Sequence, residues 1–342
     1  MAEQEGIEST FAWYAFPDDA RFKVCGLHWF EDNQPLLWRF PKDVVDRLPA
    51  GVARKVPFPS GGRLLMKSDT STLGLKVLAK NIGNGRGLDV YLNGNFYRSV
   101  VVEEVDAEVE VLFFHEFERD DREIVIYLPY HQEIEIQAIG VDGDATLQSL
   151  EPTFRSTLPI VFYGSSICQG SGAFKPGMTY SAIIGRALGI DFVNLGFGGA
   201  GKAEPEVVEL VSAIPACCYV FDLGKSYGLQ DSAPYRAMLH TIRDAHPDTP
   251  IVCVTPITSA LEIYTEMQAE RSVHTRAVAQ EAVEAALSAG VSNLHLVDGV
   301  ALLTFNEHDS LSADGLHPSD MGYDLIAQRL MPILKEVIDL LA

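Results

Sequence analysis

The chain has 342 residues, of which 47% are hydrophobic and 21% are charged, and this ordinary globular composition argues against a disordered or collagen-like chain. Lys and Arg total 26 against 47 Asp and Glu, and the formal charge of −21 disfavours binding to nucleic acid or to an anionic membrane surface. There is no apolar run long enough to span a membrane and no secretory signal at the start, so we expect a cytoplasmic protein.

The number of cysteines also favours the cytoplasm. Their number is odd, and without a secretory signal this favours reduced thiols rather than disulfides. None of them lies at a spacing typical of a zinc site, so no metal is expected. The five are Cys25, Cys168, Cys217, Cys218 and Cys253.

Residues 1–152 are predicted to form an all-β domain, a sandwich of jelly-roll type. Short apolar segments recur between turn signals at spacings of about ten residues, and several alternate apolar with polar side chains, as half-buried antiparallel strands do. Asn93-Gly94 predicts a tight hairpin, because both residues tolerate the positive φ of a type I′ turn. The predicted strands are 22–27, 62–66, 73–79, 87–92, 109–114, 123–127 and 133–138.

Residues 158–342 are predicted to form an α/β domain after a linker at 152–159. Short apolar strands alternate with amphipathic helices, which indicates βαβ units and a parallel sheet covered on both faces, a three-layer α/β/α fold of flavodoxin type. The predicted strands are 160–163, 192–195, 218–222, 251–255 and 294–297. The predicted helices are 180–188, 204–212, 235–246, 264–289 and 320–341.

Candidate functional residues follow the strands, because ligands of such sheets bind beyond the carboxyl ends of the strands. Ser166 follows the first strand, a glycine-rich segment at 196–201 follows the second, and Asp314 and His317 share one turn before the last helix. A serine needs a base to act as a nucleophile, and a histidine base needs a carboxylate to fix its tautomer. Each segment alone is common in ordinary turns, but together they predict nucleophilic catalysis.

These segments resemble the conserved blocks of the SGNH, or GDSL-type, hydrolases. Gly164-Ser165-Ser166-Ile167 stands where that family has Gly-Asp-Ser-Leu, and Asn194-Leu195-Gly196-Phe197-Gly198-Gly199 is similar to its second block. Asp314-Gly315-Leu316-His317-Pro318 is similar to the closing Asp-x-x-His-Pro block. The resemblance implies that Ser166 is the nucleophile, His317 the general base and Asp314 its carboxylate partner.

The first half carries a weaker resemblance. Gly87-Leu88-Asp89-Val90-Tyr91 is similar to the Gly-x-Asp-Leu-Tyr signature of a β-domain that precedes the hydrolase domain in one branch of this family. The resemblance therefore covers nearly the whole chain.

The resemblance also implies an oxyanion hole formed by the backbone N–H groups of Ser166 and Gly199 and by a third donor. The family has an asparagine at the third position, and this chain has Ser226. A serine hydroxyl is shorter and both donates and accepts hydrogen bonds. We therefore expect either a weaker donor at Ser226, a water in its place, or replacement by a neighbour, Lys225 or Tyr227.

We expect a serine esterase that hydrolyses small, acetyl-like acyl esters through an acyl-enzyme and needs no metal or organic cofactor. The resemblance implies a carbohydrate or polyol ester as the small-molecule substrate. Two alternatives stay open: an acyltransferase that uses the same acyl-enzyme, and a catalytically weakened domain that only binds a ligand. Lys175 and Arg271 are further candidates for contacts with substrate from the loops. The sequence leaves the oligomeric state open, with a homo-oligomer among the alternatives.

Overall fold

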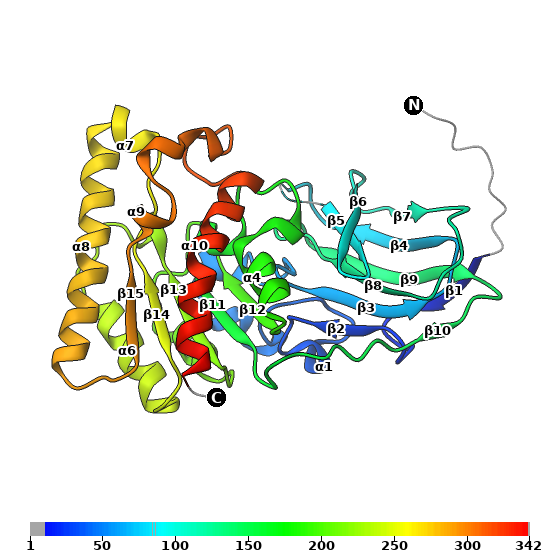
Figure 1. Ribbon diagram of the computed structural model, residues 1–342, viewed down its shortest axis with the longest axis horizontal. Helices are drawn as coiled ribbons and strands as arrows, with labels where there is room; N and C mark the ends of the chain where they lie inside the picture. The colour runs from blue at the N-terminus through cyan, green and yellow to red at the C-terminus, as the bar shows by residue number, and fades with distance from the viewer. Residues whose placement is uncertain (1–10, 84, 86, 341–342) are drawn as a thin grey trace.

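The computed structural model of the protein describes residues 11–83, 85 and 87–340, which form two lobes side by side along the long axis of the molecule (Figure 1). The lobe built from the N-terminal residues contains antiparallel sheets, and the lobe built from the C-terminal residues contains a parallel sheet with helices. The fold class predicted from the sequence is therefore confirmed. The antiparallel strands end at Gln148 and the parallel sheet begins at Ile160.

The N-terminal lobe is a sandwich of two antiparallel sheets. The four-stranded sheet has the order β1 (Phe11–Ala15), β9 (Ile134–Asp142), β4 (Leu73–Ala79) and β7 (Glu108–Phe114). The other sheet has the order β10 (Leu147–Gln148), β3 (Arg63–Ser68), β8 (Arg122–Tyr127), β5 (Gly87–Leu92) and β6 (Asn95–Val101), with β2 (Lys23–Cys25) beside β3.

Alternating side chains fill the space between these sheets. Leu75 and Val77 from β4 pack in one buried cluster with Leu64 and Met66 from β3, as the period of two in the sequence requires. The turn between β5 and β6 also follows the prediction: Asn93 has φ of 48° and Gly94 has φ of 79°.

Residues 26–62 differ from the all-β prediction, because they contain short helices and no strand. These are α1 (Phe30–Asn33), the 3-10 helix η1 (Lys42–Arg47) and α2 (Ala50–Ala53). Pro41 and Pro49 stand directly before η1 and α2, and proline has no N–H group to donate to a strand ladder.

The C-terminal lobe contains a five-stranded parallel sheet in the order β12 (Phe192–Gly196), β11 (Ile160–Gly164), β13 (Cys218–Asp222), β14 (Ile251–Val254) and β15 (Leu294–Val297). In chain order this is 2-1-3-4-5, the flavodoxin-like arrangement. The helices are α3 (Ser166–Gln169), α4 (Tyr180–Leu188), α5 (Pro205–Ser212), α6 (Ala233–Ala245), α7 (Leu261–Tyr264), α8 (Glu266–Ser288), α9 (Gly299–Leu302) and α10 (Asp320–Asp339). The 3-10 helices are η2 (Pro176–Met178), η3 (Gly224–Tyr227) and η4 (Phe305–Ser310).

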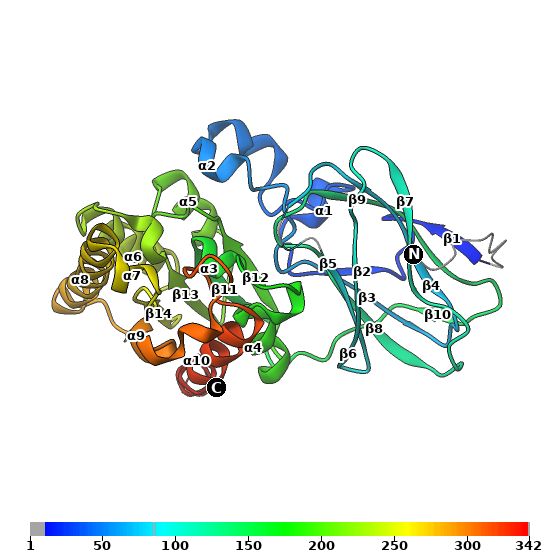
Figure 2. The same ribbon diagram turned by 90° about the horizontal axis from the view of Figure 1, so that it is seen from above.

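Helices cover both faces of the parallel sheet. Val161 and Tyr163 of β11 pack with residues of α5, α6 and α8, whereas Ile160 and Phe162 pack with residues of α4 and α10. Seen from above, α4 and α10 lie on one side of the strands, and α5, α6 and α8 lie on the other (Figure 2). The last predicted helix ends at Asp339, and residue 341 lies outside the described residues.

The register of the sheet brings three strand ends to one level. Gly164, the last residue of β11, is paired with Gly196 of β12 and with Asp222 of β13. A side chain at position 164 would overlap the carbonyl oxygen of Asp222, and one at Gly201 would overlap the carbonyl oxygen of Gly164. The loops that follow these strands therefore touch one another through their backbones.

A buried arginine joins the lobes at this edge. Arg39 is 1% exposed, and its Nη1 donates to the carbonyl oxygens of Asn194 (3.3 Å) and Gly196, at the end of β12. Its guanidinium also lies 4.2 Å from the centroid of the Phe197 ring. None of the ion pairs among the described residues includes Arg39, so backbone carbonyls and a ring compensate its charge. Burial lowers the pKa of Arg39.

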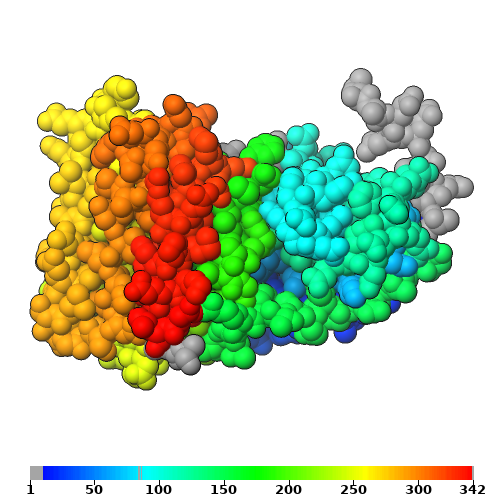
Figure 3. Space-filling model, in the orientation of Figure 1, coloured from blue at the N-terminus to red at the C-terminus, as the bar shows by residue number. Residues whose placement is uncertain are grey.

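The signature at residues 87–91 of the N-terminal lobe, called the β-lobe from here on, lies against the same junction. Asp89 is fully buried and accepts hydrogen bonds from Ser99 Oγ (2.6 Å) and from the N–H of Gly177 (2.8 Å) in η2. Tyr91 packs so close to Gly177 that a side chain at position 177 would strike its ring. In the space-filling view the green surface that includes α4 meets the cyan surface of β5 and β6 (Figure 3).

The five cysteines are free thiols, as the sequence analysis expected. Within the described residues, no helix combines the length and the apolar character that crossing a bilayer requires.

Replacing Arg39 tests the junction. Arg39→Leu leaves the buried carbonyl groups of Asn194 and Gly196 without a donor, which costs about 1–3 kcal/mol for each such group. We expect the midpoint of thermal unfolding to fall by several degrees, measured by circular dichroism. Arg54→Leu, at an exposed site nearby in sequence, serves as the control. An unchanged midpoint for Arg39→Leu contradicts the interpretation.

Candidate active site

The predicted nucleophile lies at the first of the three strand ends. Ser166 is the first residue of α3, two residues after the end of β11, and its side chain is half-buried. The N–H of Ser165 donates to the carbonyl of Asp222 (3.0 Å), which fixes the turn to the neighbouring strand β13. Gly170, with φ of 114°, ends this one-turn helix in the left-handed region.

The structure brings Ser166 and His317 together although they are 151 residues apart in sequence. Ser166 Oγ lies 2.8 Å from His317 Nε2, and His317 Nδ1 lies 2.6 Å from Asp314 Oδ2. An ionised carboxylate only accepts hydrogen bonds, so the imidazole proton belongs on Nδ1. Nε2 is then free to accept the hydroxyl proton of Ser166.

The loop that carries the histidine is closed at its base. Leu311 and Pro318 form an isolated β-bridge, and the N–H of Ser312 donates to the carbonyl of His317 (2.7 Å). The spacing Asp-x-x-His therefore forms one short hydrogen-bonded loop, as the sequence suggested.

The Asp314 carboxylate receives several hydrogen bonds. Partial burial by itself raises the pKa of Asp314, but hydrogen bonds from His317 Nδ1, from the N–H groups of His317 and Leu316, and from Ser312 Oγ together lower it to about 2. Half of the side chain is exposed. Asp314 is therefore ionised at neutral pH and accepts the hydrogen bond from His317 Nδ1 as a carboxylate.

The glycine-rich loop after β12 lies against the nucleophile. The N–H of Gly198 donates to Gln169 Oε1 (2.7 Å), and a Cβ placed on Gly198 would lie 3.5 Å from Ser166 Cβ. Gly199 follows in the left-handed region, with φ of 70°. Among the hydrogen bonds of the described residues, none uses the N–H of Ser166 or of Gly199 as donor. Both groups are therefore available to an external acceptor.

A cavity of about 130 Å³ opens beside Ser166. It contains His317 and also Ser226, so the residue that replaces the family asparagine lies in the same cavity as the nucleophile. Gly199 and Asp314 do not line it. The lining residues are Ser165, Ser166, Ile167, Lys225, Ser226, Gln268, Arg271, Leu316 and His317.

The two neighbours of Ser226 already have partners. Lys225 Nζ donates to Ser259 Oγ and pairs with Glu262, while Tyr227 Oη donates to the carbonyl of Asp231 (2.6 Å). Burial lowers the pKa of Lys225 to about 8 against the opposing effect of Glu262. Of the three candidates for the third donor, Ser226 is the one whose side chain has no hydrogen-bond partner among the described residues.

Two candidates for substrate contact have different outcomes. Lys175 pairs with Asp320 (3.7 Å) and lies 4.6 Å from the Phe96 ring, so it belongs to the lobe junction and does not line the cavity. Arg271 does line the cavity, but from helix α8 and not from a loop. The sequence alone could not predict that α8 lies near Ser166. A helical pattern in the sequence does not tell where in the fold the helix packs.

Sequence reasoning missed Gln169, which connects three parts of the site. Its Nε2 donates to the carbonyl of Tyr130 in the β-lobe (2.7 Å), its Oε1 accepts from Gly198, and its backbone carbonyl accepts from Ser60 Oγ (2.8 Å). Its spacing of three residues from Ser166, one turn of α3, was the available signal.

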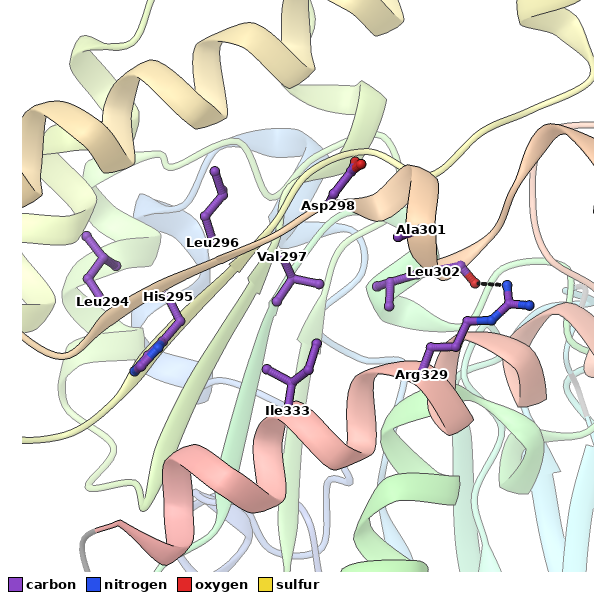
Figure 4. A pocket seen from close by; sticks show the side chains of 9 residues that line it. All are labelled: Leu294, His295, Leu296, Val297, Asp298, Ala301, Leu302, Arg329 and Ile333. Carbon is purple, nitrogen blue, oxygen red and sulfur yellow. Dashed lines mark hydrogen bonds between the residues drawn. The ribbon is translucent and has the colours of Figure 1, made fainter.

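A larger cavity, of about 540 Å³, lies at the edge strand β15 and does not include Ser166 (Figure 4). Its charged groups are engaged within the protein: Arg329 donates to the carbonyl of Leu302 (3.0 Å) and pairs with Glu307 (2.5 Å). His295 Nε2 lies 3.0 Å from Asn293 Oδ1. Size alone therefore does not identify the functional cavity.

Comparison with known proteins supports the resemblance found in the sequence. The model of the GDSL-like lipase/acylhydrolase family matches residues 157–335. The chain belongs to this family. It is therefore an SGNH-type carboxylic ester hydrolase. A search among curated proteins found no match.

Solved structures of similar fold cover almost the whole chain, including the β-lobe. A protein of Bacteroides ovatus described as a GDSL-like lipase has a TM-score of 0.85 at 24% identity, over 96% of this chain and 98% of its own. The salicylyl-acyltransferase SsfX3 from a tetracycline biosynthetic pathway has a TM-score of 0.79 at 24% identity, over 95% and 98%. The acetyl xylan esterase Est2A of the rumen bacterium Butyrivibrio proteoclasticus has a TM-score of 0.63 at 12% identity, over 95% and 98%. At these identities the likeness shows a shared fold.

A buried carboxyl group lies behind the nucleophile turn. Asp222, at the end of β13, is 5% exposed and accepts a hydrogen bond from Tyr180 Oη (3.3 Å). Burial raises its pKa from 3.8 to about 7. Between about pH 4 and 7 the folded protein therefore binds a proton that the unfolded chain releases, so this group makes the fold less stable as the pH rises through that window.

The variant Asp222→Asn should remove this pH dependence. We expect the loss of unfolding free energy between pH 5 and pH 8 to shrink by on the order of 2–3 kcal/mol, measured by urea unfolding at both values. Asp309→Asn, at an exposed site, is the matched control and should leave the difference unchanged. A pH dependence in Asp222→Asn equal to that of the natural protein would show that the carboxyl is ionised in the fold.

Proposed function

We propose that the protein is a serine esterase that hydrolyses small acyl esters, with Ser166 as nucleophile, His317 as general base and Asp314 as its carboxylate partner. The observation that carries the proposal is the hydrogen bond of 2.8 Å between Ser166 Oγ and His317 Nε2, continued at 2.6 Å from His317 Nδ1 to Asp314. This is the geometry that nucleophile, base and orienting carboxylate need.

The mechanism proceeds in two steps. Ser166 Oγ attacks the ester carbonyl while His317 Nε2 takes its proton, and the tetrahedral intermediate collapses when His317 returns that proton to the leaving alcohol. Water then attacks the acyl-enzyme, again with His317 as base, and releases the carboxylic acid and Ser166. Asp314, which stays ionised, holds the imidazole and stabilises the imidazolium in both steps.

The oxyanion is proposed to bind to the N–H groups of Ser166 and Gly199 and to the hydroxyl of Ser226. Two observations support this assignment: the two backbone donors lack internal acceptors, and Ser226 lines the cavity with Ser166. Such donors act mainly in the transition state, where the charge on the carbonyl oxygen develops.

The size and lining of the cavity favour an ester of a small acyl group with a polar alcohol. Its volume of about 130 Å³ is that of roughly four water molecules, and most of its lining side chains are polar. A carbohydrate or polyol ester suits such a lining, and the fold is shared with an acetyl xylan esterase. The five free thiols support a reducing compartment such as the cytoplasm as the place of action.

The variant Ser166→Ala tests the nucleophile. Without the hydroxyl no acyl-enzyme forms, so we expect kcat for p-nitrophenyl acetate to fall by roughly 10⁴-fold or more and labelling by a fluorophosphonate to disappear. Ser171→Ala, whose hydroxyl forms no hydrogen bond among the described residues, is the control. Turnover retained in folded Ser166→Ala would refute the assignment. Folded natural protein that neither turns over esters nor accepts the label would indicate a binding module instead.

Product analysis separates hydrolysis from acyl transfer. With a sugar or another alcohol in the assay, the proposed hydrolase releases mainly free acid. A transferase would instead release the acylated alcohol, with p-nitrophenol formed faster as the alcohol concentration rises.

The pair Ser226→Asn and Ser226→Ala tests the third oxyanion donor. Asparagine restores an amide donor at the position, so we expect its kcat to equal or exceed that of the natural protein. Alanine removes the hydroxyl, and kcat should fall by about 10-fold or more. A folded Ser226→Asn variant with lost turnover, or a Ser226→Ala variant with full turnover, contradicts the role of Ser226.

A further inference from the structure

The cavity beside Ser166 contains a positive charge that no acidic side chain balances. Arg271 lines it from α8, and none of the ion pairs among the described residues includes Arg271. The chain as a whole has a formal charge of −21, so an unpaired cation at this place is not a consequence of an excess of basic residues.

The carboxylate that pairs with Lys225 is already shared by two cations. Glu262 pairs with Lys225 and accepts from Arg276 Nη1 (2.8 Å) and Nη2 (3.0 Å). Arg276 also donates to the carbonyls of Pro256 (2.9 Å) and Ile257 (2.9 Å). Lys225 and Arg276 thus have partners inside the protein, and both oxygens of Glu262 already accept hydrogen bonds.

Arg271 is held in place but not neutralised. Its Nε donates to the backbone carbonyl of Lys225 (3.1 Å), the residue that precedes Ser226. This hydrogen bond restrains the guanidinium group. Its Nη1 and Nη2 atoms donate to no group among the described residues. Gln268 lines the same cavity one turn earlier on α8, and its side-chain amide is also without a hydrogen-bond partner there.

From this arrangement we propose that Arg271 is a specificity-determining residue, which binds a carboxylate or another anionic group carried by the ester. The proposal rests on the proposed function, and it names the substrate class of that site. A planar guanidinium with both terminal nitrogens free presents two parallel N–H donors, the arrangement that carboxylates, phosphates and sulfates accept in a bidentate manner. Gln268 supplies a neutral donor beside it.

The positive charge of Arg271 is the physical basis of the preference for an anionic ester over a neutral one. The negative field of the whole protein repels anions at long range, so an anionic ester is favoured only where a cation without an acidic partner meets it at short distance. Charge-assisted hydrogen bonds of this kind contribute about 1.5–3 kcal/mol, which corresponds to a preference of about 10- to 150-fold over a neutral analogue.

The anion can belong to the acyl part or to the alcohol part, and two pairs of probes distinguish these cases. The acyl pair is mono-p-nitrophenyl glutarate and its methyl ester. The alcohol pair is 4-acetoxybenzoate and its methyl ester. Within each pair the aryl ester that is cleaved is the same, and the carboxylate is replaced by its neutral methyl ester. The release of the phenol, corrected for the uncatalysed rate, then gives kcat/KM for the aryl ester of each member.

We expect the natural protein to prefer the charged member of one pair by at least about 10-fold. In Arg271→Gln this preference should fall to near one while kcat/KM for the neutral member changes little, and Arg271→Lys should retain part of it. Arg236→Gln on α6, which removes the same charge outside the cavity, should behave as the natural protein. Equal rates for both members of both pairs in the natural protein, or an equal loss for charged and neutral esters in Arg271→Gln, overturns the proposal.

A binding measurement separates this proposal from the proposed function. Calorimetric titration of Ser166→Ala and of the double variant Ser166→Ala/Arg271→Gln with the same esters requires no turnover. We expect the charged ester to bind the single variant at least about 10-fold more tightly than the double variant. Equal binding refutes the role of Arg271, whereas turnover by Ser166→Ala refutes the nucleophile and leaves the binding result standing.

Discussion

The close approach of three backbones at the carboxyl edge of the parallel sheet governs the site. Gly164 leaves no room between β11 and the carbonyl of Asp222, and Gly201 leaves none between the glycine-rich loop and the carbonyl of Gly164. The turn that begins with Ser166 is therefore held between the loops after β12 and β13. The positions of Ser166, Gly199 and Ser226 all follow from this contact. Main-chain packing at the strand ends therefore determines which groups meet at the site.

The β-lobe supports this edge from outside. Arg39 binds the carbonyls at the end of β12, and Gln169 links the N–H of Gly198 to the carbonyl of Tyr130. Both contacts reach the glycine-rich loop, which provides one of the proposed oxyanion donors. The N-terminal lobe is thus part of the structure that orients the site, and Asp89, which accepts a hydrogen bond from the N–H of Gly177 in η2, adds a further contact between the lobes.

Sequence patterns predicted what depends on neighbours along the chain. The predicted strands of both lobes, the Asn93-Gly94 turn and the Asp314–His317 loop follow from local periodicity, φ preferences and spacing, and the structure contains them, whereas the edge strands β1 and β10 were not predicted. The short helices between residues 26 and 62 have no periodic pattern and were missed. The spacing of Gln169 from Ser166 was the one local signal for that residue, whereas its contacts with Gly198 and Tyr130 and the cavity-lining position of Arg271 join distant segments, which no local pattern gives. The roles of the individual site residues stay predictions until the variants are measured.

The packing of residues 40–56 has a consequence for dissection of the molecule. Phe40, Leu48, Val52 and Val56 belong to the same buried cluster as Phe197 and the residues of α5 and α6. A fragment restricted to the segment matched by the family model, 157–335, would expose that apolar surface to water and lose the donor to the Gly196 carbonyl. Recombinant work on a minimal hydrolase unit from this chain must therefore retain the N-terminal segment or redesign the surface it covers.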